Sequence, residues 1–185
     1  MSRQRWAVML ACGLLTACAS LPPPGSKGFD FGAWGLNGRL AIRYGGEAAT
    51  AAFRWRQAGE SSVLELSGPF GTGGLRATLD AQGLVLEDAR GGRLEGEAAR
   101  NWLEQSVGGP LPLGHLRWWL LGRPDPALES VVDPAPDGAV FRQAGWGVTA
   151  ERFESWAGES LPTRLKLVGP GGELRLAVTR WESGP

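Results

Sequence analysis

Apolar and polar residues alternate along most of the chain from residue 34 onward. In residues 34–44, Trp34 and Leu36 would face one side of an extended chain, and Arg39 and Arg43 would face the other. A period of two predicts half-buried β-strands. The same alternation predicts further strands in residues 51–57, 61–68, 74–80, 82–88, 139–143, 146–153, 162–169 and 173–181.

Short glycine-containing segments such as "YGGE", "QAGE" and "DAQG" separate several of these strands. Segments of this kind connect neighbouring antiparallel strands as hairpins. We therefore expect an antiparallel meander of roughly ten to eleven strands.

Two segments carry their apolar residues at helical spacing instead, and both contain tryptophan. The first spans residues 97–108, and the second begins at residue 111 and is ended by Gly122 and Pro124. Residues 123–138, which hold four prolines, predict an irregular loop.

A sheet with one apolar face must bury that face against something. Because only about two helices accompany so many strands, the simplest closure curls the sheet around them. The pattern therefore predicts a mainly β domain over residues 31–183, a half-open or closed barrel with a helical lid or plug.

The N-terminal segment has the pattern of an export signal. Arg3 and Arg5 precede an apolar run over residues 6–15, and small residues follow it. The run is too short to cross a bilayer, which needs about 20 apolar residues. We expect residues 1–17 to be a removed signal peptide; a buried helix is the alternative.

The sequence "LTAC" at residues 15–18 resembles the lipobox of bacterial lipoproteins. The resemblance implies that Cys18 becomes the first mature residue and carries N-acyl and S-diacylglycerol groups. Residues 18–30, with the stiff tract "PPPG", would then form a tether. In lipoproteins an aspartate after the cysteine marks retention in the inner membrane, so Ala19 implies passage to the outer membrane.

Composition adds a limit on partners. Removing residues 1–17 takes away two of the 19 basic residues and none of the 19 acidic ones, which leaves a net charge of −2. We expect no nucleic-acid binding from this balance. The nine tryptophans suit an apolar cavity or a membrane-facing rim, although an ordinary core is the default interpretation.

The ordered segments "WGLNGRLAIR", "FRWRQ", "LELSGPFG", "LPLGHLRWWLLGRP", "QAGWGV" and "LPTRLKL" resemble the LolB family of outer-membrane lipoprotein receptors. The resemblance runs from about residue 34 to residue 181. It implies an unclosed antiparallel β-barrel of eleven strands with a helical lid, as in LolA and LolB proteins.

The resemblance also implies a function. The protein would be a monomer, anchored in the outer membrane and facing the periplasm. It would accept acylated lipoproteins from the periplasmic carrier LolA and insert them among outer-membrane phospholipids. The glycine-rich segments at 25–28 and 71–74 lack the spacing of a nucleotide-binding loop, so transfer would proceed without ATP.

Inward-facing apolar positions are the candidates for an acyl-chain cavity, with core packing as the competing interpretation at each single position. These candidates are Trp34, Leu36, Leu40, Phe53, Trp55, Leu64, Leu66, Leu75, Leu79, Leu86, Trp146, Val148, Leu165 and Leu167. Trp102, Trp118 and Trp119 are the candidate lid residues.

A bulky apolar residue is expected at a loop tip in "SGPFGTGG". Exposed apolar surface at such a place indicates a binding role. By resemblance to the LolB family, Pro69, Phe70 and Gly71 would form a membrane-insertion loop; the alternative is that Phe70 folds back onto the core.

Catalysis has little support. His115 is the only histidine, so it cannot build a histidine-rich zinc site, and no nucleophile stands at a recognisable motif beside it. We expect neither an enzyme nor a metal cofactor, and His115 is interpreted as a surface or capping group. Two alternative functions remain: a lipid-anchored, lipocalin-like binder of a small apolar ligand, and a structural lipoprotein of an outer-membrane assembly.

Overall fold

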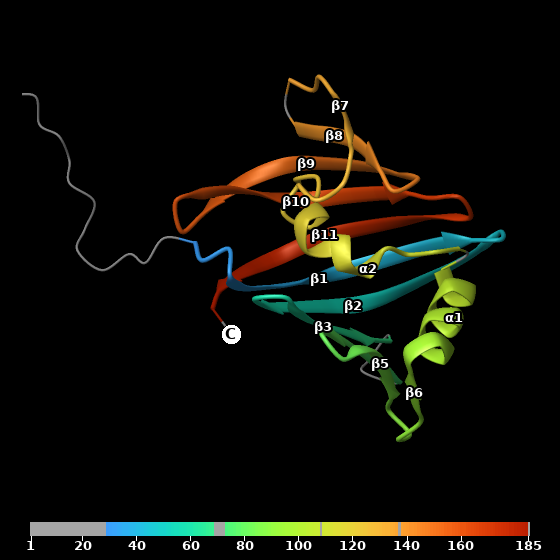
Figure 1. Cartoon of the computed structure of the whole chain (residues 1–185). Helices are drawn as coiled ribbons and strands as arrows, with labels where there is room; N and C mark the ends of the chain where they lie inside the picture. The colour runs from blue at the N-terminus through green and yellow to red at the C-terminus, as the bar shows by residue number, and fades with distance from the viewer. Residues whose placement is uncertain (1–28, 69–72, 108, 137, 185) are drawn as a thin grey trace, which may run out of the picture.

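The computed structural model describes residues 29–68, 73–107, 109–136 and 138–184. The predicted signal peptide, Cys18, most of the tether and the loop residues Pro69, Phe70 and Gly71 lie outside the described residues. Within them, eleven strands form one antiparallel sheet in the order β6-β5-β4-β3-β2-β1-β11-β10-β9-β8-β7 (Figure 1). The first and last strands in the chain, β1 and β11, are therefore neighbours in the middle of the sheet.

The strands before the helices form one half of the sheet, and those after the helices form the other. The first half comprises β1 (Ala33–Tyr44), β2 (Glu47–Ala58), β3 (Ser61–Ser67), β4 (Gly74–Asp80), β5 (Gly83–Asp88) and β6 (Arg93–Glu95). The helices are α1 (Gly96–Val107) and α2 (Leu113–Trp119). The second half comprises β7 (Val131–Asp133), β8 (Gly138–Gln143), β9 (Trp146–Trp156), β10 (Glu159–Val168) and β11 (Gly172–Ser183).

The sheet curves but stays open, because in the described part of the chain its two edge strands, β6 and β7, do not pair with each other. Both edge strands are three residues long. The prediction of an irregular loop over residues 123–138 was wrong for β7, and the sequence pattern predicted no element over the residues of β6. Three residues are too few to show an alternation that a sequence pattern can detect.

A bulge shapes the seam between β1 and β11. Gly38 pairs with Val178 and Asn37 pairs with Arg180, so Thr179 is an extra residue on β11. A Cβ atom on Gly38 would lie 2.3 Å from the carbonyl oxygen of Ala177, so only glycine fits there. Across the bulge the buried positions of β11 change from even numbers, such as Val178, to the odd-numbered Trp181. Bulges of this kind bend a strand and increase its twist, which helps the sheet to curl.

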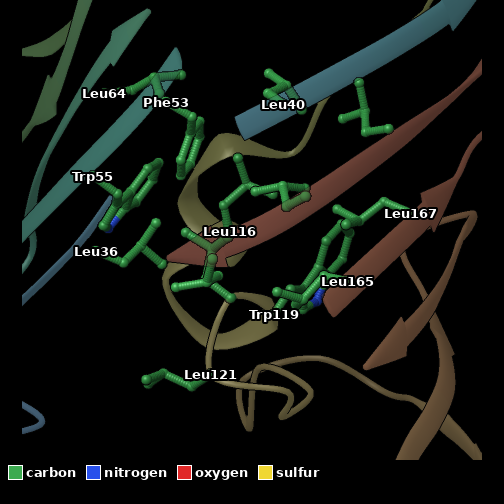
Figure 2. Close-up of a cluster of buried hydrophobic side chains, with 14 of the residues drawn as sticks. Leu36, Leu40, Phe53, Trp55, Leu64, Leu116, Trp119, Leu121, Leu165 and Leu167 are labelled. Atoms are coloured by element: carbon green, nitrogen blue, oxygen red, sulfur yellow. The ribbon is translucent and has the colours of Figure 1, made fainter. Parts of the chain in front are cut away.

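The concave face of the sheet holds the core, and α2 lies inside it (Figure 1). Figure 2 shows Leu116 and Trp119 of α2 between Leu36 and Trp55 on one side and Leu165 on the other. All five side chains are buried. Helix α2 therefore acts as a plug that joins the two halves of the sheet.

Helix α1 lies at the periphery, against β5 and β6. Only a narrow stripe of it is buried, through Ala99 and Leu103. The packed region also extends slightly beyond the predicted domain start, because Phe29 is buried and its N–H donates to the carbonyl of Ala157. In the part of the chain that the structure covers, neither helix is long and apolar enough to span a bilayer.

Candidate functional site

The predicted cavity residues come together in one apolar cluster on the concave face. Leu66, Leu75 and Leu79 are partly buried there, and the other predicted cavity residues are buried. Alternation along the strands therefore identified the inward positions, whereas their binding role stays a prediction. The cluster also contains inward residues that the sequence analysis did not select: Ala77, Leu84, Phe141, Leu161, Leu174, Leu176, Val178 and Trp181.

The plug fills the centre of this cluster. Trp119 is completely buried, with 0% of its surface exposed, and it lies 6.5 Å from the ring of Trp146. Leu120 and Leu121, which continue the chain beyond α2, are buried as well. Since the plug occupies the interior, a guest molecule can reach the apolar face only where α2 is displaced or at the margin of α2.

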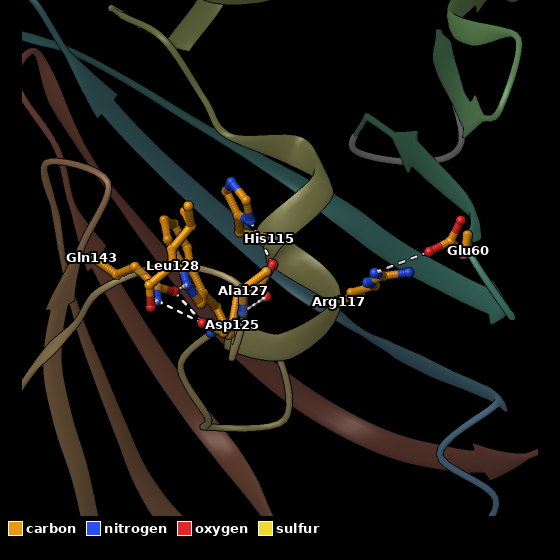
Figure 3. Close-up of polar contacts among 8 residues, drawn as sticks. Glu60, His115, Arg117, Asp125, Ala127, Leu128 and Gln143 are labelled. Atoms are coloured by element: carbon orange, nitrogen blue, oxygen red, sulfur yellow. Dashed lines mark hydrogen bonds and ion pairs between the residues drawn. The ribbon is translucent and has the colours of Figure 1, made fainter.

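Gln143 at the end of β8 fixes one side of the plug (Figure 3). Its Oε1 accepts hydrogen bonds from Trp119 Nε1 and from the Asp125 N–H, both at 2.8 Å. Its Nε2 donates to the carbonyls of Asp125 at 2.9 Å and Leu128 at 3.1 Å. The side chain is 3% exposed, so these bonds form in a low-dielectric interior where losing one is costly.

His115 and Asp125 extend this network. The Nδ1 atom of His115 lies 2.6 Å from Oδ2 of Asp125, and Oδ1 of Asp125 accepts the Ala127 N–H at 2.8 Å. Burial alone would raise the pKa of Asp125. The hydrogen bonds from Ala127 and His115, with the charges of His115 and Arg117, outweigh burial and lower the pKa of Asp125 below its usual range.

These polar residues have a structural role that the sequence pattern does not reveal. His115 is predicted to be a surface or capping group, whereas in the structure it holds the loop after α2 against the helix. Gln143 carried one available signal, since it occupies an inward position on a strand where apolar residues were expected. Among the described residues, no cluster of three or more histidine, cysteine, aspartate or glutamate side chains could hold a metal ion.

The opposite side of α2 is held differently. His115 and Arg117 are two residues apart, about 200° around the helix, and Figure 3 shows Arg117 extending away from the Gln143 network toward Glu60. Arg117 Nη2 lies 3.6 Å from Glu60 Oε1, and the Glu60 side chain is 88% exposed. An exposed ion pair of this length contributes little stability. The polar contacts of the plug are therefore strong toward β8 and weak toward the β2–β3 turn.

The three predicted lid tryptophans do not share one environment. Trp119 is buried in the core, and Trp118 is partly buried against it. Trp102 lies on α1 and is 43% exposed. The structure thus brings Trp118 and Trp119 to the plug and leaves Trp102 on the outer helix.

Solved structures share this architecture. A LolA superfamily protein from Nitrosomonas europaea superimposes with a TM-score of 0.54 at 10% identity, over 85% of this chain and 89% of that chain. A DUF1329 family protein from Desulfovibrio piger gives a TM-score of 0.50 at 8% identity, over 82% and 85%. The predicted fold class is confirmed: an unclosed, mainly antiparallel β structure of the LolA type with two helices.

Comparison with related sequences identifies the protein family. The family model described as "Outer membrane lipoprotein LolB" matches residues 32–181. The outer-membrane lipoprotein LolB of Halorhodospira halophila is 33% identical over 96% of both chains. That of Pseudomonas putida is 34% identical over 80% of this chain and 74% of its own. The chain belongs to the LolB family of outer-membrane lipoproteins.

Proposed function

We propose that this protein receives acylated lipoproteins from the carrier LolA at the outer membrane and inserts them there, as a receptor without catalytic activity. The observation that carries the proposal is the continuous apolar concave face covered by the short helix α2. Membership of the LolB family supports it. The predicted anchor on Cys18, a periplasm-facing orientation, a monomeric state and contact with phospholipid belong to the same proposal.

The energetics explain why such a receptor needs this face. Three acyl chains hold about 40 methylenes, and exposing them to water costs tens of kcal/mol. A cargo can leave its carrier only for a comparably apolar surface. Because α2 covers that surface, we propose that arriving acyl chains displace α2 from the β2–β3 side, where its polar contacts are weak.

A transfer assay tests the proposal. LolA loaded with a triacylated lipoprotein is mixed with the lipidated full-length protein in liposomes, without ATP. We expect the lipoprotein to leave LolA and appear in the liposome fraction, whereas LolA mixed with protein-free liposomes keeps its cargo. Retention of the cargo on LolA in both samples would contradict the receptor role, and copurification with a small apolar molecule instead would favour the lipocalin-like alternative.

A variant of the predicted insertion loop separates the two steps. We expect Phe70→Glu to accept lipoprotein from LolA but to fail in delivering it to liposomes, because a carboxylate does not enter the apolar bilayer. The readouts are cargo bound to the variant and cargo found in the lipid fraction. Normal delivery by Phe70→Glu would remove this role from the loop.

A further inference from the structure

Basic residues gather on the convex face of the sheet, opposite α2, over the neighbouring strands β1, β11 and β10 (Figure 1). These strands point Leu40, Leu176 and Leu165 into the core, so the residues that alternate with them project outward. We call the cations at these outward positions the basic patch, and all of them are exposed: Arg39, Arg43, Arg164, Lys166 and Arg175.

The basic patch is a local excess of positive charge in a chain that is acidic overall. The chain after residue 17 has 17 basic and 19 acidic residues, a net charge of −2. The acidic residues that share the outward face of the patch are Glu173 on β11 and Glu151 on the next strand, β9. Five cations and two carboxylates leave this area at +3, so the remainder carries −5. Such a separation of charge directs anionic partners to one face.

Much of this charge is not neutralised within the chain. Glu173 forms ion pairs with Arg175 and, at 3.2 Å, with Lys166. The other three cations of the patch are arginines, and none of them forms an ion pair with another described residue. Three exposed guanidinium groups are therefore available to anions from outside the chain.

A hollow lies among these cations. Ala177 on β11 pairs with Arg39 on one side and with Arg164 on the other. Neighbouring strands are about 4.8 Å apart, so the two arginine backbones lie roughly 10 Å apart with only a methyl group between them. The hollow has a volume of about 500 Å³, and Glu151 is its one acidic lining residue. Long, exposed arginine side chains around such a hollow can turn toward phosphate oxygens, which guanidinium groups bind well.

Exposed apolar side chains border the patch at one end. Tyr44 ends β1 and is 42% exposed, and Val168 ends β10 and is 44% exposed. The hairpin turns that follow them line a second hollow together with Arg43. Tyrosine and aliphatic groups next to arginines are typical of surfaces that rest at a membrane interface.

We propose that the basic patch docks this protein on anionic phospholipid headgroups of the outer membrane, with Tyr44 and Val168 at the interface. A bilayer offers negative charge beside apolar groups, which matches both parts of this surface. Residues 18–28 of the predicted tether span at most about 40 Å, so a lipid anchor would keep the patch near the bilayer. The proposal rests on the proposed receptor function and assigns its phospholipid contact to one face.

Liposome binding tests the proposal with the unacylated chain, residues 18–185 with Cys18→Ala, which keeps every described residue. One set of liposomes is phosphatidylcholine, and in the other set about a third of it is replaced by phosphatidylglycerol. We expect the chain to sediment with the anionic liposomes, less so as salt is added, and to stay in solution with the neutral ones. Equal binding to both sets, or no binding to the anionic set, would overturn the proposal.

Charge variants locate the contact. Arg39→Gln and Arg164→Gln should each weaken binding to the anionic liposomes about fivefold, the effect of one basic residue near a charged membrane. Arg76→Gln is the matched control, because it removes the same charge from an exposed arginine that pairs with Glu65 and lies three strands from β1. It should keep nearly all of the wild-type binding, and urea unfolding checks that each variant is folded. Equal losses in all three variants would indicate a response to total charge and contradict a defined docking face.

The transfer assay separates the docking face from the receptor function. Cargo transfer by the acylated protein, without binding of the unacylated chain to anionic liposomes, removes the docking face alone. Liposome binding without cargo transfer removes the receptor function alone. If Arg39→Gln and Arg164→Gln bind liposomes normally but unload LolA poorly in solution, the patch serves an acidic protein partner and the membrane proposal is wrong.

Discussion

Helices α1 and α2 both carry tryptophan, but their tryptophans lie in opposite surroundings. Helix α1 has twelve residues, rests on the edge of the sheet and leaves Trp102 43% exposed. Helix α2 has seven residues and buries Trp119 completely between the halves of the sheet. The shorter helix is the more deeply integrated one, which shows that position on the sheet, rather than helix length, decides what each tryptophan contributes.

The two helices are also held by different forces. Helix α1 is held by apolar contacts from Ala99 and Leu103. Helix α2 packs apolar side chains against both halves of the sheet. Its polar contacts differ, with a buried network through Gln143 on one side and an exposed ion pair with Glu60 on the other. Such an arrangement can let one margin of the plug open while the other stays in place.

The largest expected change in the free energy of unfolding distinguishes the buried Trp119 from the exposed Trp102. Trp119→Ala should lower the free energy of unfolding by about 3–5 kcal/mol, because it leaves a core cavity and removes a partner of Gln143. Trp102→Ala should change it by less than about 0.5 kcal/mol, since Trp102 is partly exposed at the surface. Urea unfolding of both variants provides the measurement. Equal losses would mean that α1 is as integrated as α2.

The next effect concerns the polar side of the plug. Gln143→Leu should lower the free energy of unfolding by about 3 kcal/mol, because Trp119 Nε1, the Asp125 N–H and two carbonyls lose their buried partner. Gln105→Leu, at an exposed position on α1, is the matched control and should be nearly neutral. If both variants unfold at the same urea concentration, the network does not fix α2.

Acid should loosen the same side of α2. The pKa of Asp125 is lower in the folded protein than in the unfolded chain, so the unfolded chain binds a proton first as the pH falls. The stability that this carboxylate contributes is therefore present above its unfolded pKa, about 3.9, and is lost as the pH falls through its folded pKa. Between pH 5 and pH 2, Asp125→Asn should lose less stability than the unmutated protein. Glu129→Gln, at an exposed position in the same loop, should lose as much stability as the unmutated protein. Parallel curves for all three proteins would refute the assignment.

The smallest effect is expected on the weak side of the plug. Glu60→Gln removes the exposed ion pair with Arg117 and should change the free energy of unfolding by less than about 0.5 kcal/mol. Urea unfolding again provides the measurement. A loss comparable to that of Gln143→Leu would mean that α2 is held equally on both sides.

Much of the sheet could be predicted because apolar and polar residues alternate wherever a strand has one buried and one solvent-exposed face. The inward positions of β1 to β5 and of β8 to β11 follow from that rule. The edge strands β6 and β7 escaped because three residues carry no period. The bulge at Thr179 also could not be predicted, since its cause is the approach of Ala177 to Gly38, which lies 139 positions earlier on the partner strand.

The candidate site was less predictable than the sheet. Helical spacing placed Trp102 on one apolar stripe and Trp119 beside another, but it could not say which stripe would meet the concave face. Gln143, Asp125 and His115 looked unrelated in sequence, because their hydrogen bonds depend on how the loop after α2 returns to β8. Hydrogen bonds between such a loop and a distant strand depend on the tertiary structure and leave no local sequence pattern.

The pairing of β1 with β11 has a consequence for how the molecule is made. A side-chain hydrogen bond across this seam joins Asn37 to Glu182, 145 positions apart. Contacts between such distant residues form slowly, because a long stretch of chain must first be closed into a loop. The seam at the centre of the sheet is thus completed only after β11 has been synthesised. Until then, the polypeptide emerging from the ribosome lacks the strand pairing that joins the two halves of its sheet.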